Sequence, residues 1–307
     1  MHKSNDTIIN YTIIIPHKNI PELLQRCLDS IPFREDVQII IVDDNSDANK
    51  VDFANFPGLN KPHVEIIFDK NINGRKGAGY ARNIGLEKAI GKWLIFADAD
   101  DYFTDCFNEL LDYYVDDKNN DIVYFKVTSA DSETLQTANR HESIIRVLDS
   151  VKQTKQFDLL LKLSVPYGKF IKMSLVKNNN ILFKEYNWSN DVMFSVKCCI
   201  FASTITISDS IAYCVTVRDG SLMYSHTLES MKTRFYSNYE SVVFIKKYNK
   251  KEKKEFILLD WWSLIYNVNK IAAVVLLPKM LYACGFKFVY KKIVKPYLIN
   301  KYKIFYE

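Results

Sequence analysis

Short apolar runs alternate with amphipathic stretches over the first half of the chain. Runs of five or six apolar residues that end at proline or polar residues are typical of interior parallel strands. Such runs occupy residues 11–16, 37–42, 64–68, 93–97 and 122–127. Apolar residues at helical spacing predict helices over 21–31, 81–90 and 107–115. This alternation predicts an α/β fold with a mostly parallel sheet and helices on both faces.

The pattern becomes looser after residue 128. The polar stretch 129–141 predicts a loop or an excursion from the sheet. Further elements are predicted as helices over 151–163, 175–180 and 192–201, and as β-rich runs over 204–207 and 211–217. From residue 228 onward the pattern is helical and increasingly basic and aromatic. We therefore expect a helical C-terminal appendage after the α/β part.

Two of the predicted strands run directly into carboxylates. Asp43 and Asp44 follow the strand 37–42, and the acidic run 98–101 follows the strand 93–97. Open α/β sheets bind ligands at the carboxyl ends of their strands. Closely spaced carboxylates repel one another unless a cation or a proton lies between them. The sequence therefore predicts a ligand site at one edge of the sheet, with a cation or a proton between the acids.

The spacing of Asp98 and Asp100 favours a metal site. With Ala99 pointing away, both carboxylates could turn toward one ion. Mg²⁺ and Mn²⁺ prefer oxygen ligands and share them with phosphate oxygens. If the other acid pair binds a base or a ribose, the two pairs together suit a nucleoside diphosphate.

Each of these features also has a structural interpretation. The run 43–46 has the composition of a turn and helix cap, and Asp101 could cap the helix 107–115. The glycine-rich run 74–79 resembles a phosphate-binding loop but lacks the Lys-Ser/Thr ending, so a flexible loop is the alternative. Asp191 could be a plain helix cap, and Arg218 could lie in a surface turn.

The composition is that of an ordinary folded protein. With 307 residues, 48% of them hydrophobic and 25% charged, the chain can bury a full core. The six cysteines form no Cys-x-x-Cys pair, and the first ten residues are polar. We therefore expect a cytoplasmic protein without structural disulfides. The histidines show no ligand spacing, so a zinc site is not expected.

The net charge of +5 conceals an asymmetry. Residues 246–307 carry 14 Lys or Arg against 4 Asp or Glu, whereas the remainder carries 27 against 32. Aromatic and aliphatic residues alternate with lysines over 261–303. This pattern predicts a peripheral contact with the inner leaflet of a membrane. The alternatives are a helical domain packed on the core and a homodimer interface. Nucleic acid is not expected, because the strand ends are acidic.

Five motifs, in order, resemble the inverting glycosyltransferases of family 2, which have the GT-A fold. They are the strand end 13–19, the Asp-Asp-x-Ser run 43–46, the Ala-Arg-Asn-x-Gly run 81–85, the Asp-x-Asp run 98–101 and the acceptor-side segment 166–194. The resemblance covers residues 11–221. It implies transfer of a hexose or an N-acetylhexosamine from a UDP-sugar to a glycan or lipid-linked saccharide, as in bacterial capsule, O-antigen or lipooligosaccharide assembly.

The resemblance also implies domains and site residues. Residues 1–225 would form the transferase domain, with the nucleotide part over about 1–127 and the acceptor part over about 128–225; residues 226–307 would form the extension. Asp98 and Asp100 would bind Mn²⁺ or Mg²⁺, and Asp191 would be the catalytic base. Asn190 stands where many relatives carry Glu. Residues expected to contact the donor nucleotide are Pro16, His17, Asn19, Asp43, Asp44, Lys76, Arg82, Asp98 and Arg218.

Two further function classes fit parts of the pattern. A catalytically silent nucleotide-sugar-binding or scaffold subunit would fit Asn190 and the basic tail. A sugar-phosphate nucleotidyltransferase would need a long glycine-rich signature after the first strand, where this chain has Pro16-His17-Lys18-Asn19. The transferase is therefore the favoured prediction.

Overall fold

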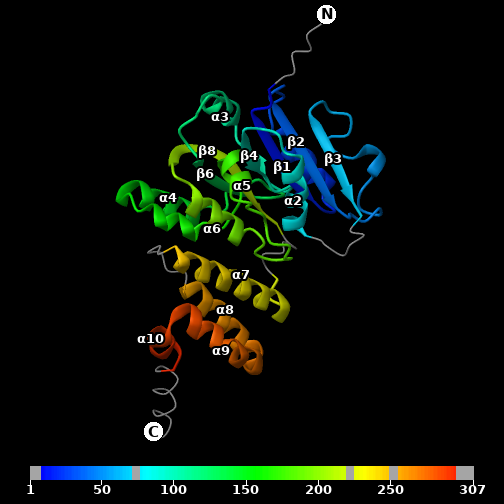
Figure 1. Ribbon diagram of the computed structural model, residues 1–307. Coiled ribbons are helices and arrows are strands. Elements are labelled where there is room, and N and C mark those ends of the chain that lie inside the picture. Colours follow the sequence, from blue (N-terminus) through cyan, green and yellow to red (C-terminus); the bar gives the residue numbers. More distant parts are fainter. Residues whose placement is uncertain (1–7, 71–76, 219–224, 249–254, 295–307) are drawn as a thin grey trace, which may run out of the picture. The chain divides into compact units, whose positions relative to one another are not determined.

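A computed structural model describes residues 8–70, 77–218, 225–248 and 255–294. The chain forms two compact units, residues 1–224 and 225–307 (Figure 1).

The first unit is built on an eight-stranded mixed sheet in the order β3-β2-β1-β4-β7-β6-β8-β5. The four strands from β3 to β4 run parallel, β7 runs antiparallel to both of its neighbours, and β8 pairs in parallel with β6. The mostly parallel sheet predicted from the apolar runs is confirmed for the nucleotide part. The strands are β1 (Tyr11–His17), β2 (Val37–Asp44), β3 (Val64–Asp69), β4 (Trp93–Phe96), β5 (Tyr102–Phe103), β6 (Ile122–Asp131), β7 (Lys169–Lys172) and β8 (Ile205–Val217).

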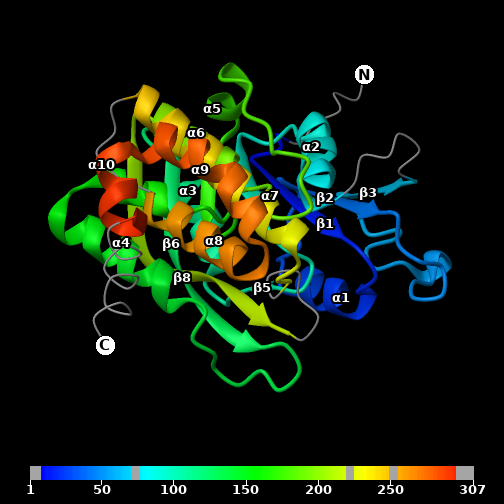
Figure 2. The same ribbon diagram turned by 90° about the horizontal axis from the view of Figure 1, so that it is seen from below.

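Helices cover both faces of this sheet. Figure 2 shows α1 and α2 on opposite sides of β1 and β2. This placement follows from right-handed crossovers that leave β1 and β3 in opposite directions along the sheet. Pro21 starts α1, where its missing N–H costs nothing. The helices of this unit are α1 (Pro21–Asp29), α2 (Ala78–Lys88), α3 (Phe107–Tyr114), α4 (Glu142–Thr154), α5 (Met173–Asn178) and α6 (Val192–Phe201).

Three expectations for the looser half need correction. The predicted loop 129–141 begins as strand, because β6 continues to Asp131. The predicted helix 151–163 is interrupted, because Lys155 adopts a left-handed conformation with φ 58° between α4 and the 3₁₀ helix Phe157–Lys162. The two β-rich runs form one strand, β8, which pairs with β6 across a register shift.

The second unit is helical, as predicted. It contains α7 (Leu228–Lys247), α8 (Glu255–Val268), α9 (Lys270–Cys284), α10 (Phe286–Val289) and the π-helical turn Tyr290–Val294. Its core has fully buried side chains from three helices, including Phe235, Leu258, Ile265, Leu276 and Met280. None of the helices in the described ranges has the length and apolar character needed to cross a membrane.

Candidate functional site

The carboxyl ends of β1, β2 and β4 place the predicted acids along one edge of the sheet. His17 and Asp43 are register partners at the ends of β1 and β2. Asp98 follows β4 by two residues, and β4 is the other neighbour of β1. The edge predicted from the strand ends is therefore present.

His17 and Asp43 form a buried network that shapes this edge. Nδ1 of His17 lies 2.7 Å from Oδ2 of Asp43, and the backbone N–H of Ile20 donates to Nε2 of the same ring at 3.2 Å. Both oxygens of Asp43 also accept from Ser46, at 2.6 and 2.9 Å. Burial acts to raise the pKa of Asp43, but the hydrogen bonds from His17 and Ser46 outweigh it and hold the pKa below its ordinary value. Both ring nitrogens of His17 thus have hydrogen-bond partners within the protein, and the His17 side chain holds Asp43 in place at the edge.

Pro16 and Asn19 also build the edge. Pro16 lies within β1 opposite Val42. Asn19 adopts a left-handed conformation with φ 61°, and its side-chain oxygen accepts from the N–H of Asp47 at 2.7 Å. Their expected contacts with a nucleotide stay predictions.

Asp44 connects the edge to the start of α2. Its Oδ2 accepts from the N–H of Gly77 at 2.9 Å and lies 3.5 Å from Nζ of Lys18. The carboxylate is only 6% exposed. Gly77 has φ 94°, a conformation that favours glycine. Lys76, predicted to approach the diphosphate, lies outside the described residues.

Arg82 joins two segments that are far apart in sequence. Its guanidinium donates to Oδ1 of Asp98 at 2.5 Å and to Oδ1 of Asn190 at 2.9 Å, and it lies 5.3 Å from the centroid of the Phe183 ring. The side chain is buried. Because Asn190 immediately precedes Asp191, this contact brings the predicted base beside the acidic edge.

Asp100 is paired with a second arginine. Nε of Arg218 donates to Oδ2 of Asp100 at 2.8 Å, and both side chains are partly exposed. The backbone carbonyl of Asp100 accepts from Arg26 at 2.6 Å and from Thr216 at 2.7 Å. The side chain of Arg218 therefore contacts the acidic run, and the turn that was the alternative interpretation, residues 218–221, extends outside the described residues.

The donor set of Asp98 and Asp100 fits a hard divalent cation. Each carboxylate has one oxygen bound to an arginine and a second oxygen for which the described residues supply no donor. Mg²⁺ and Mn²⁺ commonly take one or two protein carboxylates and complete their coordination with phosphate and water oxygens. Among the described residues, no three His, Cys, Asp or Glu side chains gather into a metal site. A cation bound here would therefore need phosphate or water oxygens to complete its coordination.

Asp101 does not cap a helix, contrary to one interpretation of the acidic run. α3 begins after Cys106, and no side chain of the described residues caps it. Asp101 is buried and accepts from the N–H of Thr216 at 2.6 Å. Burial, and then the charges of Asp100 and Asp98, raise its pKa well above the ordinary value, while Arg140 opposes them.

Asp191 lies in a site where charges of both signs meet. It occupies the N-cap position of α6, but among the described contacts its side chain accepts no capping hydrogen bond, so the plain helix-cap interpretation is wrong. Burial raises its pKa, and the nearby charge of Arg82 opposes this shift. Lys169 is a further cation near Asp191, and it is not among the site residues predicted from the sequence. Burial lowers the pKa of Lys169 to about 8, and its Nζ lies 4.8 Å from the centroid of the Tyr124 ring.

Three residues that form hydrogen bonds beside the acidic run were not predicted from the sequence. Arg26, Arg140 and Thr216 lie in α1, in the segment before α4 and in β8, and each contributes a hydrogen bond next to the acidic run. They follow no motif and come from distant parts of the chain. Only the fold reveals them.

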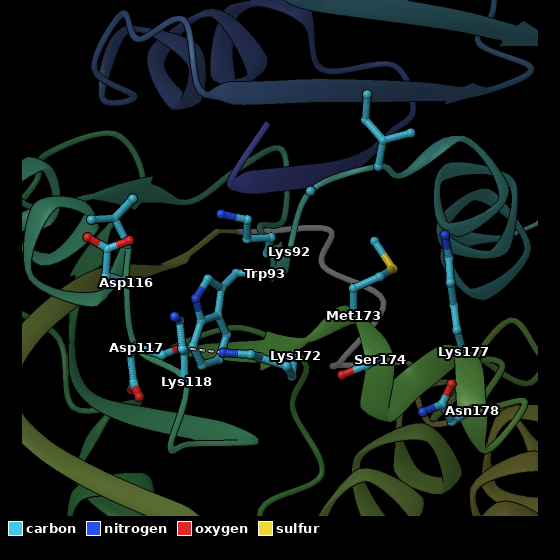
Figure 3. A pocket seen from close by; sticks show the side chains of 13 residues that line it. Lys92, Trp93, Asp116, Asp117, Lys118, Lys172, Met173, Ser174, Lys177 and Asn178 are labelled. Atoms are coloured by element: carbon cyan, nitrogen blue, oxygen red, sulfur yellow. Dashed lines mark hydrogen bonds between the residues drawn. The ribbon is translucent and has the colours of Figure 1, made fainter. Parts of the chain in front are cut away.

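A separate pocket of about 620 Å³ lies at the opposite end of β4 (Figure 3). It is lined by four lysines and Trp93, and Nζ of Lys172 lies 4.0 Å from the centroid of the indole. Lys172 also donates to the carbonyl of Asp117. The lining residues include none of the side chains predicted for the site, so this pocket is distinct from the acidic edge.

Comparison with known sequences identifies related proteins. The model of the family described as "Glycosyl transferase family 2" matches residues 12–179. The poly(ribitol-phosphate) beta-glucosyltransferase of Bacillus spizizenii is 29% identical over 220 residues, which are 69% of this chain and 33% of that protein. The poly(ribitol-phosphate) beta-N-acetylglucosaminyltransferase TarS of Staphylococcus aureus is 23% identical over 228 residues, 71% of this chain and 37% of that protein. The chain thus spans about a third of the length of these relatives.

Solved structures show the same fold. TarS 1–349 of S. aureus, in complex with UDP-GlcNAc, matches with a TM-score of 0.62 and 20% identity over 92% of this chain and 81% of that chain. The mannosyltransferase PcManGT of Pyrobaculum calidifontis, in complex with GDP-Man and Mn²⁺, matches with a TM-score of 0.52 and 13% identity over 94% of this chain and 87% of that chain. The expected GT-A fold is confirmed.

Proposed function

The chain belongs to glycosyl transferase family 2, and from that premise we propose that it transfers a hexose or an N-acetylhexosamine from a UDP-sugar to a hydroxyl group of a bacterial surface glycan, with inversion. The observation that carries this proposal is the double contact of Arg82 with Asp98 and Asn190. That contact unites the acidic edge with the segment of Asp191. A nucleotide-binding edge and a base on another segment are what a transfer between two substrates requires.

On the donor side, Asp44 is the acid proposed to accept a hydrogen bond from the uracil base. It is fixed at the end of β2 by Gly77 and Lys18, and the His17–Asp43–Ser46 network fixes the backbone beside it. The complex of TarS with UDP-GlcNAc supports a UDP-sugar as the donor. Lys76 and the two arginines of the site are the cations proposed to approach the diphosphate.

Asp98 and Asp100 are proposed to hold Mn²⁺ or Mg²⁺ through the carboxylate oxygens that the arginines leave open. A bound divalent cation would neutralise the charge that develops on the departing diphosphate. Arg82 and Arg218 compensate the same two carboxylates in the structure described. The negative charges of Asp98 and Asp100 are therefore each paired with an arginine of the same chain.

Asp191 is proposed to act as the general base. Its carboxylate would take the proton of the acceptor hydroxyl as the acceptor oxygen forms its bond to the anomeric carbon. The bond from that carbon to the diphosphate oxygen breaks on the opposite face, and the diphosphate leaves with the electron pair. A carboxyl group whose pKa is raised by burial is a stronger base than an exposed aspartate.

The acceptor is proposed to be a teichoic-acid-like polymer or a lipid-linked saccharide. The names of the relatives support a polyol-phosphate polymer, because both act on poly(ribitol-phosphate). We place the reaction in the cytoplasm. The second candidate is a catalytically silent nucleotide-sugar-binding subunit, which Asn190 favours because the resemblance to the family implies an acid at this position, where this chain has an amide.

The two candidates differ in turnover. We expect the protein to hydrolyse or transfer from UDP-glucose or UDP-GlcNAc with Mn²⁺, and to lose this activity with a chelator. Asp191→Asn should lower the rate by about a thousandfold or more while UDP binding, measured by calorimetry, is retained. Asp116→Asn, an exposed acid at the opposite edge, is the matched control. Binding of UDP without turnover in the unmodified protein would instead establish the silent subunit, and absence of both would reject the proposal.

A further inference from the structure

Helix α9 is apolar on all sides. Only two of its 15 residues, Lys270 and Lys279, are charged, and the others are aliphatic, aromatic, methionine, proline or cysteine. A surface helix of a globular protein normally has one apolar face and one polar face. A helix without a polar face has a second apolar surface to cover.

One face of α9 is already covered by its own unit. Ala273, Leu276, Met280 and Ala283 point into the core formed with α7 and α8. The indole N–H of Trp262 donates to the carbonyl of Ala273 at 2.8 Å, which fixes α9 against α8. The orientation of α9 within this unit is therefore set by packing.

The opposite face is exposed along its whole length. Ile271, Val275 and Tyr282 recur at helical spacing and are 80%, 66% and 71% exposed. Val274 flanks them at 57% exposure, and Phe286, the first residue of α10, is 72% exposed. Contiguous exposed apolar side chains of this kind mark an interaction surface.

The charges in the segment that carries this stripe all have one sign. Residues 261–306 contain no aspartate or glutamate. Eight lysines stand in the same segment, at positions 270, 279, 287, 291, 292, 295, 301 and 303. In the described part of the segment, Lys270, Lys287, Lys291 and Lys292 are exposed. The segment therefore combines an apolar stripe with charges that are all positive.

The apolar stripe and the positive charges together favour one of the three partners that could cover this face: a second copy of the chain, a nucleic acid or a lipid bilayer. A second copy of the chain would bring the same lysines face to face in a two-fold interface, where like charges repel. A nucleic acid would match the charge but would leave the aliphatic stripe without an apolar partner. A bilayer with anionic lipids supplies both an apolar layer and a negative surface.

We propose that the exposed face of α9 binds the surface of an anionic lipid bilayer, with the helix lying parallel to it. The parallel orientation follows because the other face of α9 is held in the protein core. A helix of 15 residues is about 22 Å long, so the stripe offers several turns of contact. The proposal concerns binding alone and does not depend on the transfer reaction.

The test is flotation of the full-length protein with lipid vesicles. The unmodified protein should bind vesicles of mixed phosphatidylcholine and phosphatidylglycerol at least about tenfold better than vesicles of phosphatidylcholine alone. Ile271→Ser with Tyr282→Ser should lower binding to the mixed vesicles about tenfold or more, because both side chains leave the acyl boundary. Lys287→Gln, Lys291→Gln and Lys292→Gln together should remove the preference for the anionic lipid.

Phe33→Ser with Tyr113→Ser is the matched control, because these side chains of the first unit are 74% and 77% exposed. It should bind vesicles as the unmodified protein does. Equal binding by the α9 variant and the control would overturn the proposal, as would absence of binding to anionic vesicles. Light scattering after gel filtration tests whether a second copy of the chain binds this face instead. A dimer that the α9 substitutions dissociate, in a protein that does not bind vesicles, would assign the face to self-association and reject the proposed binding to a bilayer.

Discussion

Gly79 offers a sharp test of how the fold positions the proposed base. It lies in the first turn of α2, against the segment that leads to Asp191. A β-carbon added at this position would lie 2.1 Å from the carbonyl oxygen of Lys184 and 2.7 Å from Cβ of Asn190. The carbonyl oxygen belongs to the backbone, so a rotation of a side chain cannot relieve the contact. Gly79→Ala must therefore displace either α2 or the segment 184–190.

The size of the displacement follows from these distances. To bring the contact from 2.1 Å to the 3.0 Å below which real β-carbons are essentially never found, the segments must separate by about 0.9 Å. Alanine in a helix gains about 0.5–1 kcal/mol over glycine, whereas overpacking costs about 1–3 kcal/mol. We expect a net loss of stability of about 1–2 kcal/mol. A shift of about 1 Å in a reacting group lowers rates about a hundredfold.

Gly85→Ala is the control on the same helix. The new β-carbon there would lie 2.5 Å from Cγ2 of Ile14, a side-chain methyl in the core of the sheet. Urea unfolding and the kcat/KM for transfer should be measured for both variants. We expect both to lose stability, but only Gly79→Ala to lose about a hundredfold in kcat/KM with UDP binding preserved. A Gly79→Ala variant with unchanged kcat/KM would refute the argument that this contact sets the position of Asp191.

Three further predictions test the charges of the site. Arg82→Met removes the cation that opposes the raised pKa of Asp191. The acid limb of the pH profile of kcat/KM should therefore move to higher pH. An acid limb at the same pH would mean that Arg82 does not act on Asp191, the proposed base. Asp43→Asn should cost about 1–3 kcal/mol at pH 7 in urea unfolding. Because the folded pKa of Asp43 is lowered, its contribution is present above the unfolded pKa and is lost as the pH falls through the folded value, so the difference between variant and parent should shrink in acid. Lys169→Met removes a buried lysine whose pKa is lowered to about 8 from 10.5. Between these values the unfolded chain binds more protons, so the stability of the parent should rise by up to about 3 kcal/mol as the pH increases, and the variant should lack this rise.

The first half of the fold was predictable because its signals are local. The apolar run 37–42 is long enough to be a buried strand, and Val37–Asp44 is β2. Asp43 and Asp44 were expected after the strand and instead form its last two residues, because their backbone continues the pairing with β3. The edge was predictable for the same reason, since parallel strands end together.

The second half depends on contacts that a sequence pattern does not contain. The polar run Ser208-Asp209-Ser210 divides β8 into two apolar pieces, yet the strand continues because β6 pairs with it on both sides of the irregularity. β7 has only four residues and runs antiparallel between two strands, so no period of two could develop. Thr216 of β8 donates to Asp101, and Arg140, from the segment before α4, donates to the carbonyl of Thr216.

Asn190 affects the balance of charges at the proposed site. Arg82 donates one hydrogen bond to the neutral amide of Asn190 and one to the carboxylate of Asp98. A glutamate at 190 would compete with Asp98 for the same guanidinium and would add a negative charge beside Asp191. A nearby like charge raises the pKa of a carboxyl group, so Asp191 would hold its proton more tightly. The amide keeps the connection between the acidic edge and the segment of the proposed base, and it leaves the charge of Arg82 to Asp98 and Asp191. On this reasoning Asn190→Glu should move the acid limb of the kcat/KM profile to higher pH, and an unchanged profile would show that Arg82 compensates the added charge.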